Sequence, residues 1–166
     1  MPCFLIFVGV KIIILCIGDT RAAYIRDGMA EYSARIKHYA PCDIEVISEK
    51  KVWRKLPADA RKKAEGEAIL SAIASGDMAV LLDENGTEYG SRAFAAKLEK
   101  YAGAGHKRLV FVIGGAFGFS PEVCAAVKTK MSLSKMTFNH EMVRLFMLEQ
   151  IYRAFSILRN EPYHND

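Results

Sequence analysis

The sequence predicts one α/β domain built on a mainly parallel sheet with flanking helices. Short apolar runs rich in β-branched residues alternate with longer stretches whose apolar residues recur every three or four positions. A chain of 166 residues is typical of one domain, and it buries roughly 70% of the surface its unfolded form exposes. Twelve glycines and five prolines are ordinary usage, which excludes a collagen-like or disordered chain.

The first half of the chain supplies two strands and two helices. Residues 11–17 predict a buried strand, and residues 21–39 predict a helix. Residues 43–47 alternate as a short strand does, and residues 57–75 predict a second helix that Gly76 stops. The apolar stripe of the first helix consists of Ala22, Ile25, Met29, Tyr32 and Ile36.

The second half adds two buried strands and two long helices. The strands are predicted at residues 78–82 and 109–113, with a helix over 91–101 between them. The tetrapeptide Glu84-Asn85-Gly86-Thr87 predicts a turn. Residues 140–159 predict the last helix.

A shorter helix is predicted to begin at Ser120-Pro121-Glu122. Its hydroxyl cap, a proline at the first helical position and an acid near the positive end of the dipole all favour that start. Residues 131–135, farther along, predict a short strand or a loop.

The apolar N-terminal segment does not predict a membrane protein. Residues 3–18 are nearly all apolar but are interrupted by Lys11, and the run is shorter than the roughly 18–20 residues that span a bilayer. A secretory signal would carry its positive charge ahead of the apolar run, not within it. We therefore expect a cytoplasmic protein that does not bind a membrane.

The cysteines and histidines predict no metal site. Cys3, Cys16, Cys42 and Cys124 are scattered, with no closely spaced pair and no histidine at a metal-ligand spacing. Reduced, buried thiols in the cytosol are the simpler interpretation.

The net charge of +4 is concentrated in one stretch. Residues 50–63 carry seven basic residues and one acid. Trp53 among these lysines and arginines offers a stacking surface of the kind that RNA-binding proteins use, while a solvated loop and helix start is the alternative.

The last helix is apolar around most of its circumference. Twelve of the seventeen residues from 142 to 158 are apolar, whereas a surface helix needs an apolar stripe on one face only. A self-association face explains the excess, and a helix at the centre of the monomer is the alternative.

Three segments are candidates for a binding site. FVIGGAFGFSPE joins a buried strand to a capped helix through three glycines, but it lacks both the Lys-Ser/Thr of a phosphate loop and the spacing of a dinucleotide fingerprint. A nucleoside-type ligand remains, unless the glycines serve only a tight turn. SLSKMTFNHE could line a slot for a ring or be a plain loop, and the terminal RNEPYHND could carry chemistry or be a frayed tail.

Together these segments resemble the RlmH family of SPOUT-class methyltransferases, which methylate N3 of a pseudouridine in 23S ribosomal RNA with S-adenosylmethionine. The resemblance rests on FVIGGAFGFSPEV, SLSKMTFNHEMVRLFMLEQIYRAF and NEPYH, and it covers residues 11–164. It implies a C-terminal trefoil knot, a homodimer that packs its C-terminal helices, and a substrate in the large subunit or the 70S ribosome.

The same resemblance implies the site residues. Arg153, Tyr163 and His164 match positions associated with substrate recognition and catalysis: His164 would assist removal of the proton or position the base, Tyr163 would stack on it or hydrogen-bond it, and Arg153 would hold a phosphate or the base. The residues implied for the S-adenosylmethionine pocket are Leu82, Gly114, Leu133, Ser134, Lys135, Met136, Thr137 and Phe138.

The chain departs from its family pattern at a few positions. Asn139 stands where relatives usually have proline, Ala116 also differs, and the tail ends in Asn165-Asp166 where a basic residue is common. Relatives tend to begin near Lys11, so we expect residues 1–10 to be an N-terminal extension, with an early-assigned start as one explanation, and residues 11–166 to be the methyltransferase domain.

Two other functions stay open on the sequence. One is a ribosome-binding or RNA-binding module without activity, which the altered tail favours. The other is a Rossmann-like oxidoreductase, which the failed dinucleotide fingerprint disfavours.

Overall fold

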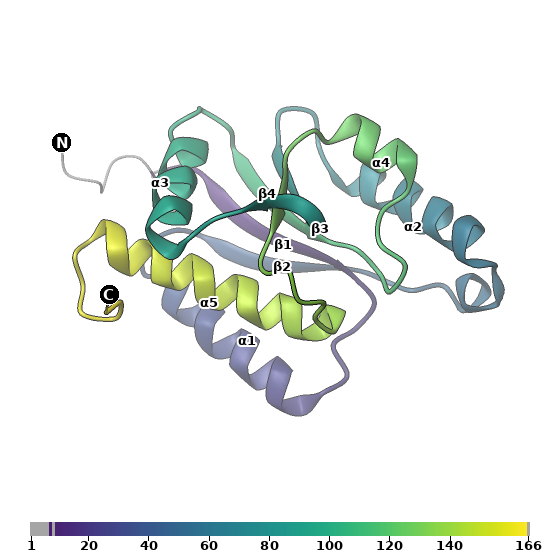
Figure 1. Cartoon of the computed structure of the whole chain (residues 1–166), viewed down its shortest axis with the longest axis horizontal. Helices are drawn as coiled ribbons and strands as arrows, with labels where there is room; N and C mark the ends of the chain where they lie inside the picture. The colour runs from purple at the N-terminus through teal and green to yellow at the C-terminus, as the bar shows by residue number, and fades with distance from the viewer. Residues whose placement is uncertain (1–6, 8, 166) are drawn as a thin grey trace.

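The computed structural model describes residue 7 and residues 9–165 of the chain (Figure 1). Most of the predicted N-terminal extension, residues 1–10, therefore lies outside the described residues. The part that is described belongs to the core: Phe7 is 7% exposed, and its ring meets the ring of Phe155 edge-on with 4.7 Å between centroids. Val10 is also buried.

The described residues form one five-stranded sheet in the order β2-β1-β4-β3-β5, and every neighbouring pair is parallel. This confirms the predicted α/β class. The trefoil knot stays a prediction of the family resemblance. The strands are β1 (Lys11–Ile17), β2 (Cys42–Ile47), β3 (Met78–Glu88), β4 (Arg108–Ile113) and β5 (Lys130–Ser132).

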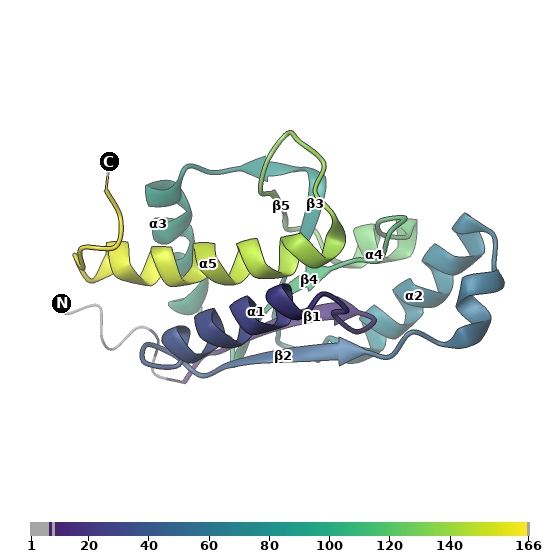
Figure 2. The ribbon, with the colours of Figure 1, turned by 90° about the horizontal axis from the view of Figure 1, so that it is seen from below.

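The helices cover both faces of the sheet. One face carries α1, α3 and α5, and the other carries α2, α4 and a short 3-10 helix, η2. Figures 1 and 2 both show α1 and α5 running alongside one another. The bounds are α1 (Ala23–Ile36), η2 (Lys51–Lys55), α2 (Ala58–Ala72), α3 (Ser91–Ala102), α4 (Pro121–Ala126) and α5 (His140–Leu158).

The continuous apolar run of β1 follows from this two-sided covering. Ile12 and Ile14 belong to the core under α1, α3 and α5, while Ile13 and Leu15 belong to the core under α2 and α4. Successive strand residues point to opposite faces, so a strand covered on both sides is apolar at every position.

The predicted turn at residues 84–87 is wrong, because β3 continues through it. Leu82 and Thr87 both align with Met131 of β5, and the register shifts between them, as at a bulge. A Cβ at Gly86 would collide with the backbone of Met131, so this close approach needs glycine.

The predicted cap at Ser120 is confirmed, and Asn139 caps the last helix as well. The Val123 N–H donates to Oγ of Ser120 at 3.4 Å, and the Glu141 N–H donates to Oδ1 of Asn139 at 2.8 Å. Asn139 therefore supplies a side-chain cap that a proline cannot.

The outer side of α5 keeps apolar surface. Five of its twelve apolar residues are buried: Met147, Leu148, Ile151, Ala154 and Phe155. The other seven keep contact with solvent, and Phe146 among them is 37% exposed. Those seven are Met142, Val143, Leu145, Phe146, Tyr152, Ile157 and Leu158.

No helix in the described part of the chain is long and apolar enough to cross a membrane. Cys16, Cys42 and Cys124 are free thiols, and Cys3 lies outside the described residues. Within residues 7 and 9–165, no group of three or more histidine, cysteine or acidic side chains could hold a metal ion.

Candidate functional site

A cavity of about 430 Å³ opens at the carboxyl ends of β4 and β5, beside the bulge that begins after Leu82 in β3. Ligands of parallel α/β sheets bind at this edge, and the volume suits a small molecule. The wall consists of residues 82–85, 113–119, 131–134 and 136–138, with His140 and Val143 from the first turn of α5.

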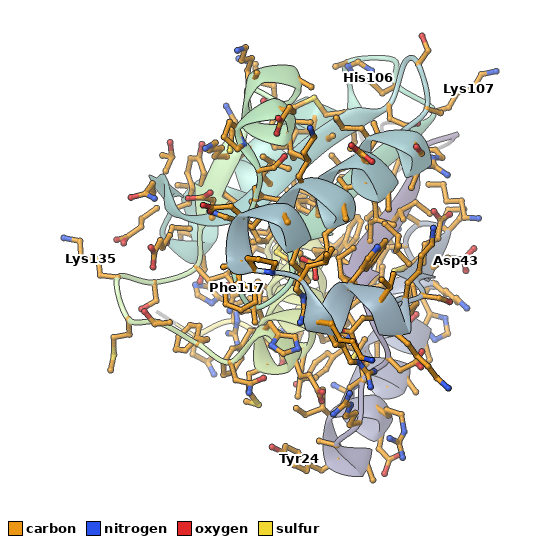
Figure 3. The ribbon with its side chains drawn as sticks, turned by 90° about the vertical axis from the view of Figure 1, so that its right-hand side faces the viewer. Tyr24, Asp43, His106, Lys107, Phe117 and Lys135 are labelled. Carbon is orange, nitrogen blue, oxygen red and sulfur yellow. The ribbon has the colours of Figure 1, made fainter. Side chains whose placement is uncertain are left out.

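The structure gathers seven of the eight predicted cofactor-binding residues at this one cavity. The eighth, Lys135, is exposed and outside the wall, and Figure 3 shows its side chain pointing away from the protein. Binding of the cofactor by these residues stays a prediction. The seven are Leu82, Gly114, Leu133, Ser134, Met136, Thr137 and Phe138.

The glycine loop after β4 is held against α2 by a buried carboxylate. Glu65 is 1% exposed, and a Cβ at Gly115 would overlap its Oε2. Arg61 donates through Nε to Oε1 of Glu65 at 2.8 Å and also pairs with Glu49. The Arg61 guanidinium lies 5.5 Å from the ring centroid of Phe117, which is part of the cavity wall. One arginine thus connects α2 to the loop that forms the cavity.

The second loop of the wall, after β5, is ordered by its own serines. Ser132 Oγ donates to the Ser134 carbonyl at 2.9 Å, and the Met136 N–H donates to Ser134 Oγ at 2.9 Å. The Phe138 ring lies 5.1 Å from that of Phe146 on α5. These contacts turn the loop toward the cavity and leave Met136 74% exposed.

The charge of the cavity wall does not favour a phosphate-bearing ligand. Asp83 and Glu84 line it, and neither lysine nor arginine stands among its lining residues. Asp83 accepts the Asn85 N–H at 2.8 Å and lies 3.7 Å from the Lys130 ammonium. The wall therefore suits a ligand that is neutral or positively charged, rather than a phosphate ester.

His140 presents an imidazole to the cavity. Burial lowers the pKa of His140 below its ordinary 6.5, and the positive charge of Arg144 lowers it further. The carboxylates of Glu141, Glu49 and Glu65 act in the opposite direction without reversing the shift. The ring is therefore neutral at pH 7, and no hydrogen bond joins it to another described residue.

The first turns of α5 also fix the end of β1. Arg144 is fully buried and donates to the carbonyls of Ile17 at 2.6 Å and Gly18 at 2.9 Å. It also donates to the Thr20 hydroxyl at 2.8 Å. This attachment sets the position of His140, one turn earlier on the same helix.

The three predicted catalytic residues meet at the other end of α5. Arg153 Nη1 lies 3.3 Å from Nδ1 of His164, and the Arg153 guanidinium lies 4.8 Å from the ring centroid of Tyr163. Glu149 holds the cluster together: it accepts from Arg153, and from the Tyr163 hydroxyl at 3.0 Å. Burial, a hydrogen bond with the Tyr32 hydroxyl and the hydrogen bond that Tyr163 donates to Glu149 raise the pKa of Tyr163, so its phenol keeps its proton. We call Glu149, Arg153, Tyr163 and His164 the tail cluster.

The tail cluster is far from the cavity of its own chain. His140 at the cavity and Arg153 are thirteen residues apart on α5, which is about 20 Å along a helix axis. In Figure 1 the C-terminal tail lies at one end of α5, and the loop that leads into α5 lies at the other end.

Comparison with known proteins decides the family. The family model described as "Predicted SPOUT methyltransferase" matches residues 10–164. Relatives named ribosomal RNA large subunit methyltransferase H match almost end to end. The protein of Parabacteroides distasonis is 49% identical over 94% of this chain and 99% of its own length. That of Christiangramia forsetii is 47% identical over 92% and 97%. The chain belongs to the RlmH family of SPOUT methyltransferases.

The sequence of this RlmH-family methyltransferase did not indicate three residues that shape the cavity or the tail cluster. His140 and Glu149 were not singled out, although four-residue spacing from Glu149 to Arg153 on a helix is a recognisable signal for an ion pair. Glu65 lies in a helix whose basic and acidic residues resemble a solvated face, so only the structure reveals its burial.

The predicted stacking surface at Trp53 is wrong. Trp53 is 5% exposed and belongs to the core with Ile13 and Leu15, so its ring is not available to a base. Burying the large apolar surface of the indole ring stabilises the fold, although the residues on either side of Trp53 in the sequence are largely charged. The positive charge near it is exposed on Lys50, Lys51, Lys55 and Lys63, whereas Arg61 is engaged by Glu49 and Glu65.

Proposed function

We propose that this RlmH-family enzyme transfers the methyl group of S-adenosylmethionine to N3 of a pseudouridine in large-subunit ribosomal RNA, acting on assembled ribosomes in the cytoplasm. One observation carries the proposal. The glycine loop after β4 and the loop after β5, the two segments that match the family's cofactor positions, line one cavity beside the bulge of β3. The relatives' name supplies the RNA, and the family resemblance supplies the donor and the target base.

The cavity fits the proposed donor in size and in charge. S-adenosylmethionine supplies an activated methyl group on a positively charged sulfonium, and it carries no phosphate. Asp83 and Glu84 suit the positive charges of such a ligand, and Leu82 and Leu133 offer apolar contact to its rings. The backbone beside Gly114 and Gly115 allows close approach.

The tail cluster completes the site only if a second copy supplies it. A separation of about 20 Å along α5 keeps His164 away from the cavity of its own chain. The outer side of α5 includes Phe146, which is exposed near the cavity, and Ile157, which is partly exposed near the tail. Antiparallel pairing of this side in a twofold dimer would cover it and bring each tail to the other copy's cavity. We therefore propose a homodimer through α5.

We propose that His164 acts on the substrate as a hydrogen-bond donor. Arginine can only donate, so in the 3.3 Å contact with Arg153 the Nδ1 of His164 is the acceptor and Nε2 carries the ring proton. Nε2–H can then donate to a carbonyl oxygen beside N3 of the base, which stabilises the negative charge that develops as N3 loses its proton. Arg153 adds positive charge to the same place, and Glu149 keeps both Arg153 and Tyr163 in position.

The exposed lysines near η2 give the dimer a surface for the ribosome. Lys50, Lys51, Lys55 and Lys63 are exposed, and positive side chains bind RNA phosphates without sequence preference. Their contribution would be to affinity and to the rate of encounter rather than to the choice of nucleotide.

The proposal is tested by methyl transfer from labelled S-adenosylmethionine to 70S ribosomes with and without pseudouridine at the target position. We expect transfer only to ribosomes that contain pseudouridine, together with calorimetric binding of S-adenosylmethionine to the protein alone. Transfer to neither preparation, with no binding of the donor, would contradict the proposal and favour a non-catalytic RNA-binding module.

A further inference from the structure

A second hollow of about 400 Å³ lies at the outer edge of the sheet, between the end of β3, α3 and the segment that leads into β5. Lys97, Lys128 and Lys130 line it together with Tyr89 and Tyr101. Neither aspartate nor glutamate is among its lining residues. A concave surface with three ammonium groups and no carboxylate in its wall attracts an anion.

Lys130 and Tyr101 in this hollow keep their protons at neutral pH. The hydrogen bond to Cys124 raises the pKa of Lys130, and Asp83 adds to the shift. Burial raises the pKa of Tyr101 to about 12, and Tyr89 adds to that shift. The Lys130 ammonium and the Tyr101 phenol are therefore in the protonated form that donates hydrogen bonds.

Two of the three lysines are available to a ligand. Lys128 is exposed, and no described residue forms an ion pair with it. The Lys97 ammonium lies 5.2 Å from the ring centroid of Tyr101, a contact that leaves its charge unneutralised. Lys130 is partly neutralised by Asp83 at 3.7 Å.

The hollow adjoins the cavity of the same chain. Asn85 lines both, because β3 runs through the bulge at residues 82–87 and passes from one to the other. A strand of nucleic acid with one nucleotide at the cavity therefore has a basic surface directly alongside, where its next phosphates would pass.

We propose that the hollow formed by Lys97, Lys128 and Lys130 binds the phosphodiester backbone of the RNA substrate next to the nucleotide at the cavity. The inference rests on the proposed function, which supplies the RNA. The phosphates would fix the position of the strand, and base recognition would be left to the cavity and the tail cluster.

The test compares two double variants with the same change of net charge. Lys97→Glu with Lys128→Glu removes the two available charges and leaves Lys130 to hold Asp83. Lys37→Glu with Lys107→Glu is the control, since both lysines are exposed and lie at the amino ends of β2 and β4, the opposite edge of the sheet. Thermal unfolding and calorimetric binding of S-adenosylmethionine establish that both variants are folded.

We expect the hollow variant to raise KM for ribosomes while kcat stays unchanged. The salt dependence of its binding to large-subunit RNA should weaken by about one unit of log–log slope for each lysine removed. The control should keep both values near wild type. Equal behaviour of the two double variants would overturn the proposal.

Two further measurements separate related outcomes. If the wild-type protein transfers no methyl group, the proposed function fails, while binding of the RNA to the variants still reports on the hollow. Inorganic phosphate is titrated as a second ligand. If phosphate binds at the hollow but the hollow variant binds RNA as the control does, the site serves a free anion and the RNA proposal is overturned.

Discussion

The carboxylate of Glu65 occupies the space in which a side chain at position 115 would begin. A Cβ at Gly115 would overlap Oε2 of Glu65 and lie 3.0 Å from its Cδ. Glu65 is 1% exposed and is held by Arg61, so it cannot move aside. The position of the glycine loop, and with it one wall of the cavity, is therefore set by α2 on the far face of the sheet.

Replacing Gly115 by alanine is expected to displace the loop and weaken binding of S-adenosylmethionine at least tenfold. Overpacking of a rigid site costs about 1–3 kcal/mol, and a tenfold change in affinity corresponds to about 1.4 kcal/mol. Gly90→Ala is the matched control, because nothing lies within 4 Å of a Cβ built there. Isothermal titration calorimetry measures both variants, and an unchanged affinity for Gly115→Ala would contradict a cofactor site at this loop.

Replacing Arg61 by methionine is expected to destabilise the fold by about 3 kcal/mol, because it leaves the buried Glu65 carboxylate without its partner. The double variant Arg61→Met, Glu65→Gln should recover most of that loss. Arg54→Met is the control: Arg54 also bonds Glu49, but its side chain is 53% exposed and its removal should cost no more than about 1 kcal/mol. Urea unfolding gives the free energies, and equal losses for the two single variants would refute the role given to Glu65.

The neutral His140 predicts a pH dependence of stability. Because burial and Arg144 lower its pKa in the folded state, the unfolded chain takes up this proton first as the pH falls below about 6.5, and stability is lost over that range. His140→Gln should reduce the loss in stability between about pH 7.5 and 5, whereas His38→Gln, at an exposed position, should not. Urea midpoints across this range measure it. Parallel curves for His140→Gln and wild type would contradict the assignment.

The tail cluster predicts that His164→Ala lowers kcat for ribosome methylation by at least about a hundredfold, the scale of a positioned proton-handling group. Glu149→Gln should lower it as well, because Arg153 and Tyr163 lose their common acceptor. His106→Ala is the control, since its ring bonds the Gly76 carbonyl away from both sites. Single-turnover methyl transfer measures the rates, and wild-type turnover by His164→Ala would remove the residue from the mechanism.

Local signals were enough to predict most of the fold. The strand predicted at residues 11–17 is confirmed. A short, continuous run of β-branched apolar residues is typical of a strand that is covered on both faces. The cap at Ser120 acts within three residues of itself. The predicted helix end at Gly76 is late, because α2 ends at Ala72 and Gly76, at φ +92°, lies in the turn that follows. The continuation of β3 through residues 84–87 depends on Met131, far along the chain, and no local pattern reports that contact.

The site was predicted less completely than the fold, and largely through the family resemblance. The loop at residues 133–138 has an unremarkable composition, yet it lines the cavity except at Lys135, whose outward direction is set by turns within the loop. Trp53 and Glu65 are residues whose burial the local sequence does not predict. Both lie in stretches dominated by charge, and both are buried, because what covers them comes from other parts of the chain.

The central claim is that the cavity of one copy works with the tail cluster of the other, and mixing two inactive variants tests it most directly. Gly115→Ala damages the cavity, and His164→Ala damages the tail. After subunit exchange, a mixed dimer has one intact cavity facing one intact tail. At a limiting concentration of S-adenosylmethionine, we expect each variant alone to be nearly inactive and the mixture to regain about a quarter of wild-type methyl transfer, since half of the dimers would carry one working site of two. A mixture that exchanges subunits, as mass spectrometry of tagged chains would show, yet stays inactive would contradict the account.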